Sequence, residues 1–357
     1  FFNFDLVRFV STPDETLEFE RFKKGEIDVY IVNRAQFWAE KFDDKFEDYK
    51  RGLVIRRKIF NENPVGISGI AINMRKEPFN DVRVRKAFGF MYDRIKFNER
   101  LFFNAYLPID SYFPGTEYEN PNDPKIRFNI DSAQRLLSEA GWKEKNKDGY
   151  LIKDGKIFEV DLPMQKGMDR YFTIYQEDLK KVGVKLNLKE IDLTTIFKLG
   201  NERNFKLLPM SWAGLKIPNP ENYLKSKTAD EEGSTNWPGI KNPRIDELCV
   251  AYDTTFDMKA RVKILKEIDF IACNEFGYVF GWYPPYIRIA FHNKFGFPEG
   301  IIARNYDVMT VLPYMWFNDP EKAAEYDAAV MDKSKTLQGG DEENKYWQNL
   351  KEKKNDK

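Results

Sequence analysis

The chain has 357 residues, and its 57 lysines and arginines balance its 57 aspartates and glutamates, which gives a formal net charge of zero. At about 100–200 residues per domain, this length predicts two or three hydrophobic cores. The neutral balance does not indicate a nucleic-acid partner, and no apolar run reaches the roughly 20 residues of a membrane-spanning helix. Aromatic residues make up 15% of the chain. Aromatic side chains are common in ligand-binding walls as well as in cores.

Strand-like and helical patterns alternate in the first part of the chain. Strands are expected over residues 6–10, 27–32, 53–60 and 66–74. Asp14 can open an amphipathic helix that ends at Gly25, a residue type common at helix C-termini. The strand–helix–strand order predicts a parallel sheet. Because Phe2–Val10 already has a strand pattern, we expect the domain to begin before the first residue.

Helical and strand-like patterns continue through the rest of the chain. Helices are expected to begin near Asp81 and near Asn129 or Asp131, and to cover residues 172–182, 243–252 and 258–274. Strands are expected over residues 160–164, 184–191, 205–212 and 278–295. The alternation of strand-like and helical patterns along the chain predicts an α/β protein with mixed sheets flanked by helices. Residues 332–357 are polar and charged, and we expect a solvated tail.

The residues typical of catalysis are scarce. Cys249 and Cys273 are the two cysteines, too few for a disulfide framework or a cysteine-built zinc site. The one histidine, His292, lies in a strand-like run, where a structural role is usual. The sequence has no phosphate-binding loop, dinucleotide fingerprint, zinc-protease motif or nucleophile elbow. We therefore expect no catalytic residue, no metal site and no cofactor, and a protein that is not an enzyme.

Aromatic residues gather where predicted strands run into loops. Such loops meet at the strand ends of open α/β sheets, where ligands bind. A glycine-flanked strand adds one polar candidate. The candidate ligand-binding residues are Asn73, Ser211, Trp212, Ser234, Asn236, Trp237, Trp282 and Tyr283. The alternative is that these aromatic rings fill a seam between two domains.

Four motifs occur in order along the chain. They are K-G-E-I-D at 24–28, P-F-N-D-V-R-V-R-K-A at 78–87, A-Q-R-L-L-S-E-A-G-W at 133–142 and N-P-R-I-D-E-L at 242–248. Together they resemble the family 5 extracellular solute-binding proteins of bacterial ABC importers, the oligopeptide- and dipeptide-binding group. Residues 98–113 further resemble the YejA-like branch of that family. The resemblance covers about residues 5–330 and leaves the family's N-terminal portion missing.

The resemblance implies part of a two-lobed, class C periplasmic binding protein fold. It implies that residues 1–70 belong to the first lobe, 71–286 to the second lobe, 287–330 to the return into the first lobe, and 331–357 to a charged C-terminal tail. The implied function is to capture peptides between the two lobes and to deliver them to the membrane permease of an ABC transporter. The implied location is periplasmic or extracytoplasmic, and the full-length protein is expected to be a monomer with no nucleic-acid partner.

One position departs from the family pattern. In the family's oligopeptide binders, an Asp three residues after the Trp that matches Trp212 holds the peptide's amino terminus. Leu215 stands there in this chain. A non-peptide solute, such as an oligosaccharide or a modified oligopeptide, is therefore an alternative ligand. A hydrolase, or a scaffold that has lost ligand binding, would be a different function for the same fold.

Overall fold

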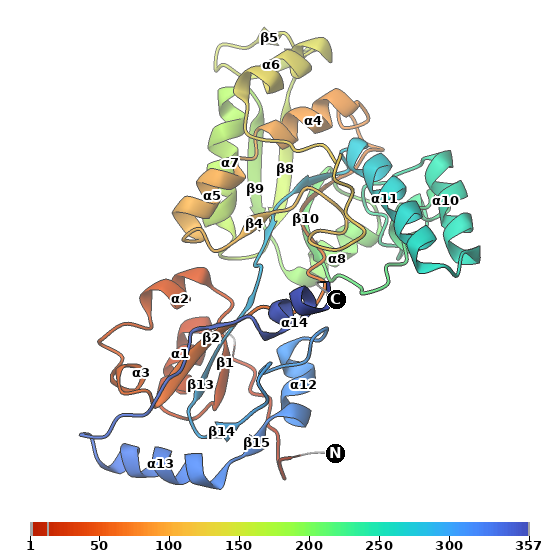
Figure 1. Ribbon diagram of the computed structural model, residues 1–357. Helices are drawn as coiled ribbons and strands as arrows, with labels where there is room; N and C mark the ends of the chain where they lie inside the picture. Colours follow the sequence, from red (N-terminus) through yellow and green to blue (C-terminus); the bar gives the residue numbers. More distant parts are fainter. Residues whose placement is uncertain (1–2, 13, 356–357) are drawn as a thin grey trace. The chain divides into compact units, whose positions relative to one another are not determined.

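The computed structural model describes residues 3–12 and 14–355, except for the side chains of residues 352, 354 and 355. The chain divides into two compact units. Unit 1 comprises Phe1–Asn63, Leu101–Ala105 and Pro284–Lys357, and unit 2 comprises Pro64–Arg100 and Tyr106–Tyr283. The chain passes between the units at residues 63–64, 100–101, 105–106 and 283–284. From the sequence, changes of lobe were expected at 70–71 and 286–287. Figure 1 shows the helices and strands of each unit.

Unit 1 contains a four-stranded sheet in the order β1 (Val29–Ile31), β13 (Ile287–His292), β2 (Val54–Ile59) and β16 (Glu343–Asn344). β13 runs antiparallel to both β1 and β2, and β16 runs parallel to β2. The parallel sheet predicted from the first strand–helix–strand pattern is therefore wrong. The described residues at 6–10 form no strand, and Phe2 lies outside the described residues.

Helices and a separate two-stranded antiparallel pair accompany the unit 1 sheet. They are α1 (Glu15–Lys23), α2 (Ala35–Glu40), α3 (Glu47–Lys50), α12 (Val308–Met315), α13 (Pro320–Met331), α14 (Tyr346–Asn355), β14 (Phe295–Gly296) and β15 (Phe317–Asn318). Asp14 caps α1, because its Oδ1 accepts a hydrogen bond from the Leu17 amide at 2.9 Å. Burial of Phe19 and Phe22 on α1 against the ring of Tyr30 on β1 then fixes this helix on the sheet.

The side chains of residues 332–351 are exposed or half-buried, but hydrogen bonds fix this C-terminal region on unit 1, whereas the sequence predicted a solvated tail. The Arg51 guanidinium donates hydrogen bonds to the carbonyls of Ala329, Asp332 and Lys335. Trp347 Nε1 donates to the carbonyl of Ile302 at 2.9 Å. The charged composition of this region indicated a solvated tail, but its backbone carbonyls bind Arg51, which lies far from the region in the sequence.

Unit 2 contains the central antiparallel sheet β10 (Leu207–Trp212), β3 (Ile67–Ile72) and β11 (Tyr278–Phe280), with β3 in the middle. A separate parallel pair is formed by β8 (Glu159–Met164) and β9 (Lys185–Glu190). The short strands are β4 (Leu107–Pro108), which pairs with β12 (Trp282–Tyr283), and the three-stranded β5 (Glu144–Lys145), β6 (Leu151–Lys153) and β7 (Lys156–Ile157). The expected α/β fold with mixed sheets is confirmed.

Several helices of unit 2 begin directly after residues whose side chains cap them. They are α4 (Val82–Phe90), α5 (Arg94–Leu101), α6 (Ile130–Glu139), α7 (Asp169–Lys181), α8 (Leu193–Asn201), α9 (Glu221–Leu224), the 3-10 helix η1 (Ser226–Ala229), α10 (Pro243–Thr254) and α11 (Met258–Asn274). Asp81 caps α4 through the Arg83 amide at 2.8 Å, and Asn129 caps α6 through the Ser132 amide at 2.8 Å.

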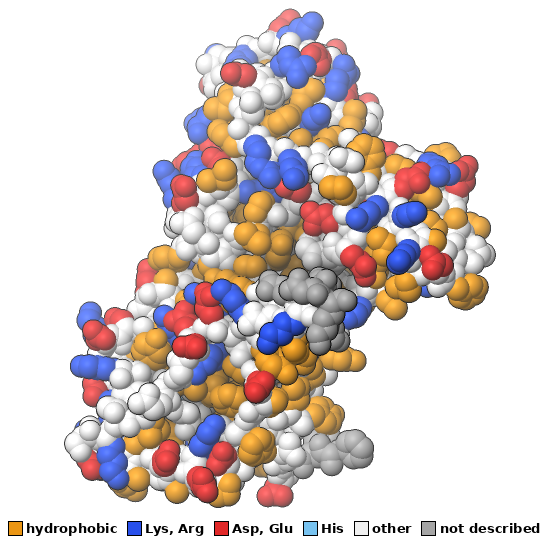
Figure 2. All heavy atoms as spheres, viewed as in Figure 1, with side chains coloured by type: hydrophobic (Ala, Val, Ile, Leu, Met, Phe, Trp, Pro, Cys, Tyr) orange, Lys and Arg blue, Asp and Glu red, His pale blue; other side chains and the backbone are white. Residues whose placement is uncertain are grey.

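Across the described residues, no helix combines the length and the apolar character that a membrane crossing requires. On the face in Figure 2, acidic and basic side chains are interspersed over both units, as the net charge of zero suggests.

Candidate functional site

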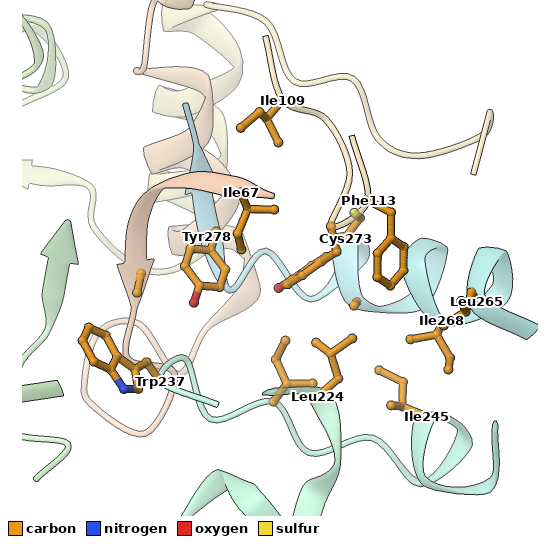
Figure 3. Close-up of a cluster of buried hydrophobic side chains, with 14 of the residues drawn as sticks. Ile67, Ile109, Phe113, Leu224, Trp237, Ile245, Leu265, Ile268, Cys273 and Tyr278 are labelled. Atoms are coloured by element: carbon orange, nitrogen blue, oxygen red, sulfur yellow. The ribbon is translucent and has the colours of Figure 1, made fainter. Parts of the chain in front are cut away.

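One hydrophobic cluster of unit 2 lies between its central sheet and the helices α8–α11. Figure 3 shows Ile67 on β3 and Tyr278 on β11 within this cluster, together with Trp237 and Leu224. The sheet therefore supplies one wall of the cluster, and loops and helices from later in the chain supply the others.

A cavity of about 360 Å³ opens beside this cluster, and every residue that lines it belongs to unit 2. Its walls come from the start of β3, the loop at 112–116, and the end of β10 with the loop that follows it and helix α9. The aromatic residues that line it are Tyr112, Phe113, Trp212, Tyr223 and Tyr278. None of the lining residues, all of which are described, has a charged side chain. We refer to this cavity as the aromatic pocket.

Trp212 is fixed in the wall of the aromatic pocket. It ends β10, where it lies opposite Ile67 on β3. Its Nε1 donates a hydrogen bond to the Tyr278 hydroxyl at 3.1 Å, and its ring meets the Trp237 ring edge to face, with 5.1 Å between centroids. Burial raises the pKa of Tyr278 above its ordinary value, so this hydroxyl stays protonated and uncharged. The indole is thus held by one polar contact and one aromatic contact.

The opposite wall is a loop that α11 holds in place. The Asp269 carboxylate of α11 accepts hydrogen bonds from the Ser111 hydroxyl at 2.7 Å, the Tyr112 amide at 2.8 Å and the Asn120 amide at 3.0 Å. The Tyr112 ring packs edge to face on Tyr278, at 5.9 Å between centroids. A single buried carboxylate therefore fixes both ends of the loop that lines this side.

Among the sequence-predicted site residues, Trp212 lines the aromatic pocket. Ser211 precedes it and is exposed, and successive side chains of a strand point to opposite faces. Trp237 is 1% exposed and lies behind Trp212 as part of the core. Ser211 and Trp237 therefore do not line the aromatic pocket together with Trp212.

The predicted polar residues brace loops of the protein. Asn73 is fully buried, and its Nδ2 donates to the carbonyls of Arg203 and Phe205, each at 2.9 Å. Asn236 is also fully buried and bonds within its own turn, with Nδ2 donating to the carbonyl of Ile240 at 3.0 Å. The Ser234 hydroxyl bonds to the Thr228 carbonyl and the Arg203 guanidinium. These polar atoms satisfy the backbone, and none of the three residues lines the aromatic pocket.

The pair Trp282 and Tyr283 lies on β12, outside the aromatic pocket. The Trp282 ring stacks on Tyr92 with 5.6 Å between centroids and 10° between planes, and its carbonyl accepts from Ser68 Oγ at 2.6 Å. Tyr283 is half-buried, and its hydroxyl lies next to Gly115. Sequence reasoning instead missed Tyr112, Tyr223 and Tyr278, although Tyr112 lies in the segment 98–113 that resembles the YejA-like branch.

The thiols and the histidine are buried. Burial raises the pKa of Cys249 to about 11 and that of Cys273 well above its ordinary value, so both are protonated at neutral pH. His292 Nε2 bonds to the Phe22 carbonyl at 2.9 Å, and Nδ1 bonds to the Tyr326 hydroxyl at 2.8 Å. These contacts make His292 a structural residue of unit 1.

Comparisons with known proteins identify the class. The fold is that of the periplasmic binding proteins, which solved structures of peptide-binding members share. The model of the bacterial extracellular solute-binding proteins, family 5, middle portion, matches residues 2–235 of this chain. The chain belongs to this family of solute-binding proteins. The resemblance seen in the motifs is thereby confirmed.

The relatives differ in what is known of them. The uncharacterized protein YejA of Escherichia coli is 25% identical over 363 residues, covering 92% of this chain and 59% of that protein. The structure of the oligopeptide-binding protein AppA from Bacillus subtilis, in complex with a nonapeptide, matches with a TM-score of 0.70 at 22% identity, covering 86% of this chain and 59% of that one. DppA from Helicobacter pylori, in complex with the peptide STSA, matches with a TM-score of 0.70 at 16% identity, covering 87% and 56%. The chain spans between half and three-fifths of the length of these proteins.

Proposed function

We propose that this protein captures peptides outside the cytoplasm and delivers them to the membrane permease of an ABC transporter. Its membership of the solute-binding family supports a transport role, and the two structures in complex with peptides support the ligand class. The aromatic pocket receives one side chain of the bound peptide. Binding leaves the peptide intact, because the protein acts as a carrier.

The lining of the aromatic pocket is the observation that carries this proposal. Its volume of about 360 Å³ falls within the range of about 300–1,000 Å³ usual for ligand sites. Its five aromatic rings offer a large apolar area, while the side chains of Asn219, Asn222 and Thr235 can bond to peptide groups. A peptide with an aromatic or aliphatic side chain fits both features.

The same lining disfavours charged groups. A buried charge without a partner costs several kcal/mol, on the order of the ion desolvation penalty. No lining residue offers an opposite charge, and Leu215, at the edge of the aromatic pocket, is 59% exposed and apolar. We therefore infer that the pocket takes an uncharged side chain and does not hold a free peptide amino terminus.

Titration calorimetry tests the proposal with three peptides and one sugar. We expect Ala-Phe-Ala to bind, its acetylated form to bind equally well, and Ala-Glu-Ala to bind at least about tenfold more weakly, equivalent to about 1.4 kcal/mol. Mass spectrometry should find Ala-Phe-Ala intact after long incubation. Binding of cellohexaose without binding of any peptide would contradict the peptide proposal, and release of peptide fragments would indicate a hydrolase.

A further inference from the structure

The carboxylate that anchors the pocket loop has a second carboxyl group beside it. Asp123 and Asp269 each place an oxygen within 4.8 Å of the other and of Cys273 Sγ. Asp269 is fully buried, and Asp123 is 5% exposed. Asp123 follows the anchored loop closely, since its amide donates to the Asn120 carbonyl at 3.2 Å. Two acidic groups thus share one buried space behind the aromatic pocket.

The two carboxyl groups have different surroundings. Asp269 accepts hydrogen bonds from a hydroxyl and two amides of the loop, and the Cys273 thiol lies 3.6 Å from its Oδ1. Both oxygens of Asp123 are buried and have no hydrogen-bond partner among the described residues. The charged groups that act on Asp123 are Asp269 and Glu119, both acidic, and the titratable Cys273 thiol also faces it. An ionised Asp123 would therefore be buried, unpartnered and next to like charges.

Such a pair must lose one negative charge, either to a proton or to a bound cation. Two adjacent buried carboxylates cannot both stay ionised, and the one with fewer donors keeps the proton. A calcium ion needs about 6–8 oxygen ligands and a structural zinc ion about four ligands. Only three residues among those described offer a possible metal-ligand atom here, and one of these atoms is a thiol sulfur. The Asp269 carboxylate also already accepts several hydrogen bonds from the loop. A proton therefore fits the site better than a metal ion.

We propose that Asp123 is protonated at neutral pH and that its O–H donates a hydrogen bond to Asp269, which makes it a positioning residue for the pocket loop. Burial, followed by the neighbouring Asp269, raises the pKa of Asp123 to about 9. Once protonated, the Asp123 carboxyl group has an O–H with which it can form a hydrogen bond, whereas the ionised form has no partner for either oxygen in the described part of the chain. Protonation also removes the charge repulsion that would push Asp269 away from the loop. The inference rests on contacts within unit 2 and holds whichever solute the protein binds.

Infrared spectroscopy of the intact protein tests the protonation directly. At pH 7 we expect a carbonyl band of a protonated carboxyl group that shifts on ¹³C-aspartate labelling and is lost in Asp123→Asn. Asp178→Asn is the matched control, because Asp178 is equally buried but is paired with Lys96 and Lys181. The band should persist in that variant. Absence of any such band from the native protein at pH 7, or its persistence in Asp123→Asn, would overturn the proposal.

The pH dependence of the melting temperature provides a second test. A carboxyl group whose pKa is raised on folding gives stability that is complete below its unfolded pKa of about 3.9 and is lost as pH rises toward its folded pKa. We expect the melting temperature of the native protein to fall more steeply between pH 5 and 9 than that of Asp123→Asn, which keeps a donor but cannot ionise. Asp123→Ala should melt lower than Asp123→Asn at pH 5. A rise in melting temperature with Ca²⁺ or Zn²⁺ that depends on Asp123 would instead assign a cation to this site.

Discussion

The packing behind Trp212 can be tested by adding one methyl group to α8. Gly200 lies one residue before the end of this helix, and a Cβ atom there would lie 2.3 Å from Cζ2 and 2.5 Å from Cε2 of Trp237. Real Cβ atoms essentially never approach another atom so closely. The Trp237 ring cannot move aside freely, since it is 1% exposed and contacts the rings of Phe197, Phe205 and Trp212.

Two effects of opposite sign decide the outcome of Gly200→Ala. Alanine favours a helix over glycine by about 1 kcal/mol. Overpacking a core costs about 1–3 kcal/mol, and a rigid indole that is held on several sides lies toward the upper end of that range. We therefore expect Gly200→Ala to lower the free energy of unfolding by about 1–2 kcal/mol, the difference between these two effects.

A matched control lies at the same position of another helix. Gly89 stands one residue before the end of α4, and the nearest atom to its Cβ would be Ile126 Cγ2 at 3.4 Å. Here helix propensity acts almost alone, so Gly89→Ala should leave stability unchanged or raise it by up to about 1 kcal/mol. Urea unfolding, followed by circular dichroism, measures both variants. Equal or greater stability of Gly200→Ala would refute the reasoning that Trp237 is fixed.

Three other predictions concern the aromatic pocket, one cap and one buried histidine. Trp212→Ala should weaken binding of Ala-Phe-Ala by about 1–3 kcal/mol in calorimetry. Leu193→Ala, which truncates an exposed leucine of α8 outside the pocket, should leave binding unchanged. Unfolding of Trp212→Ala would show that the ring mainly serves the core. Asp81→Ala should cost about 1 kcal/mol in urea unfolding through loss of the α4 cap, and an unchanged midpoint would contradict that role. Burial lowers the pKa of His292, so the unfolded chain takes up this proton first as pH falls. Stability should therefore decline below about pH 6.5, and the single histidine signal in NMR should titrate below that pH.

Local features of the fold could be predicted from the sequence because a short segment determines them. Asp81 and Asn129 were expected to start helices, and each accepts a hydrogen bond from an amide two or three residues later. The end of β10 at Trp212 was also expected from its own pattern. Such contacts need no information from distant parts of the chain.

Strand pairing and the C-terminal packing could not be predicted in the same way. β1 pairs with β13, which lies more than 250 residues later, so no local pattern at β1 shows its antiparallel neighbour. The carbonyls of the C-terminal region bind Arg51 across a similar distance in sequence. A charged composition therefore did not show whether this region was packed or solvated.

Only part of the candidate site could be predicted, because some of its residues give a local signal in the sequence and others are brought together only by folding. Trp212 was found because an aromatic residue at a strand end is a visible signal. Asn73 was chosen as a polar residue on a glycine-flanked strand, but its amide donates to the carbonyls of residues 203 and 205, whose proximity the sequence does not show. Tyr278 and Asp269 belong to elements far from Trp212 in the sequence, and only folding brings them to the same site.

The aromatic pocket thus depends on two supports that contribute no lining atom. On one side, the fully enclosed Trp237 ring, packed on Gly200, prevents the Trp212 indole from sinking into the core. On the other side, Asp269 holds the loop of Tyr112 by charge-assisted hydrogen bonds, about twice as strong as neutral ones. Because a protein interior is close-packed, displacement of either support shifts the wall in front of it. Substitutions at Gly200 and Asp123 should therefore change peptide affinity, although neither residue can touch the peptide in the pocket.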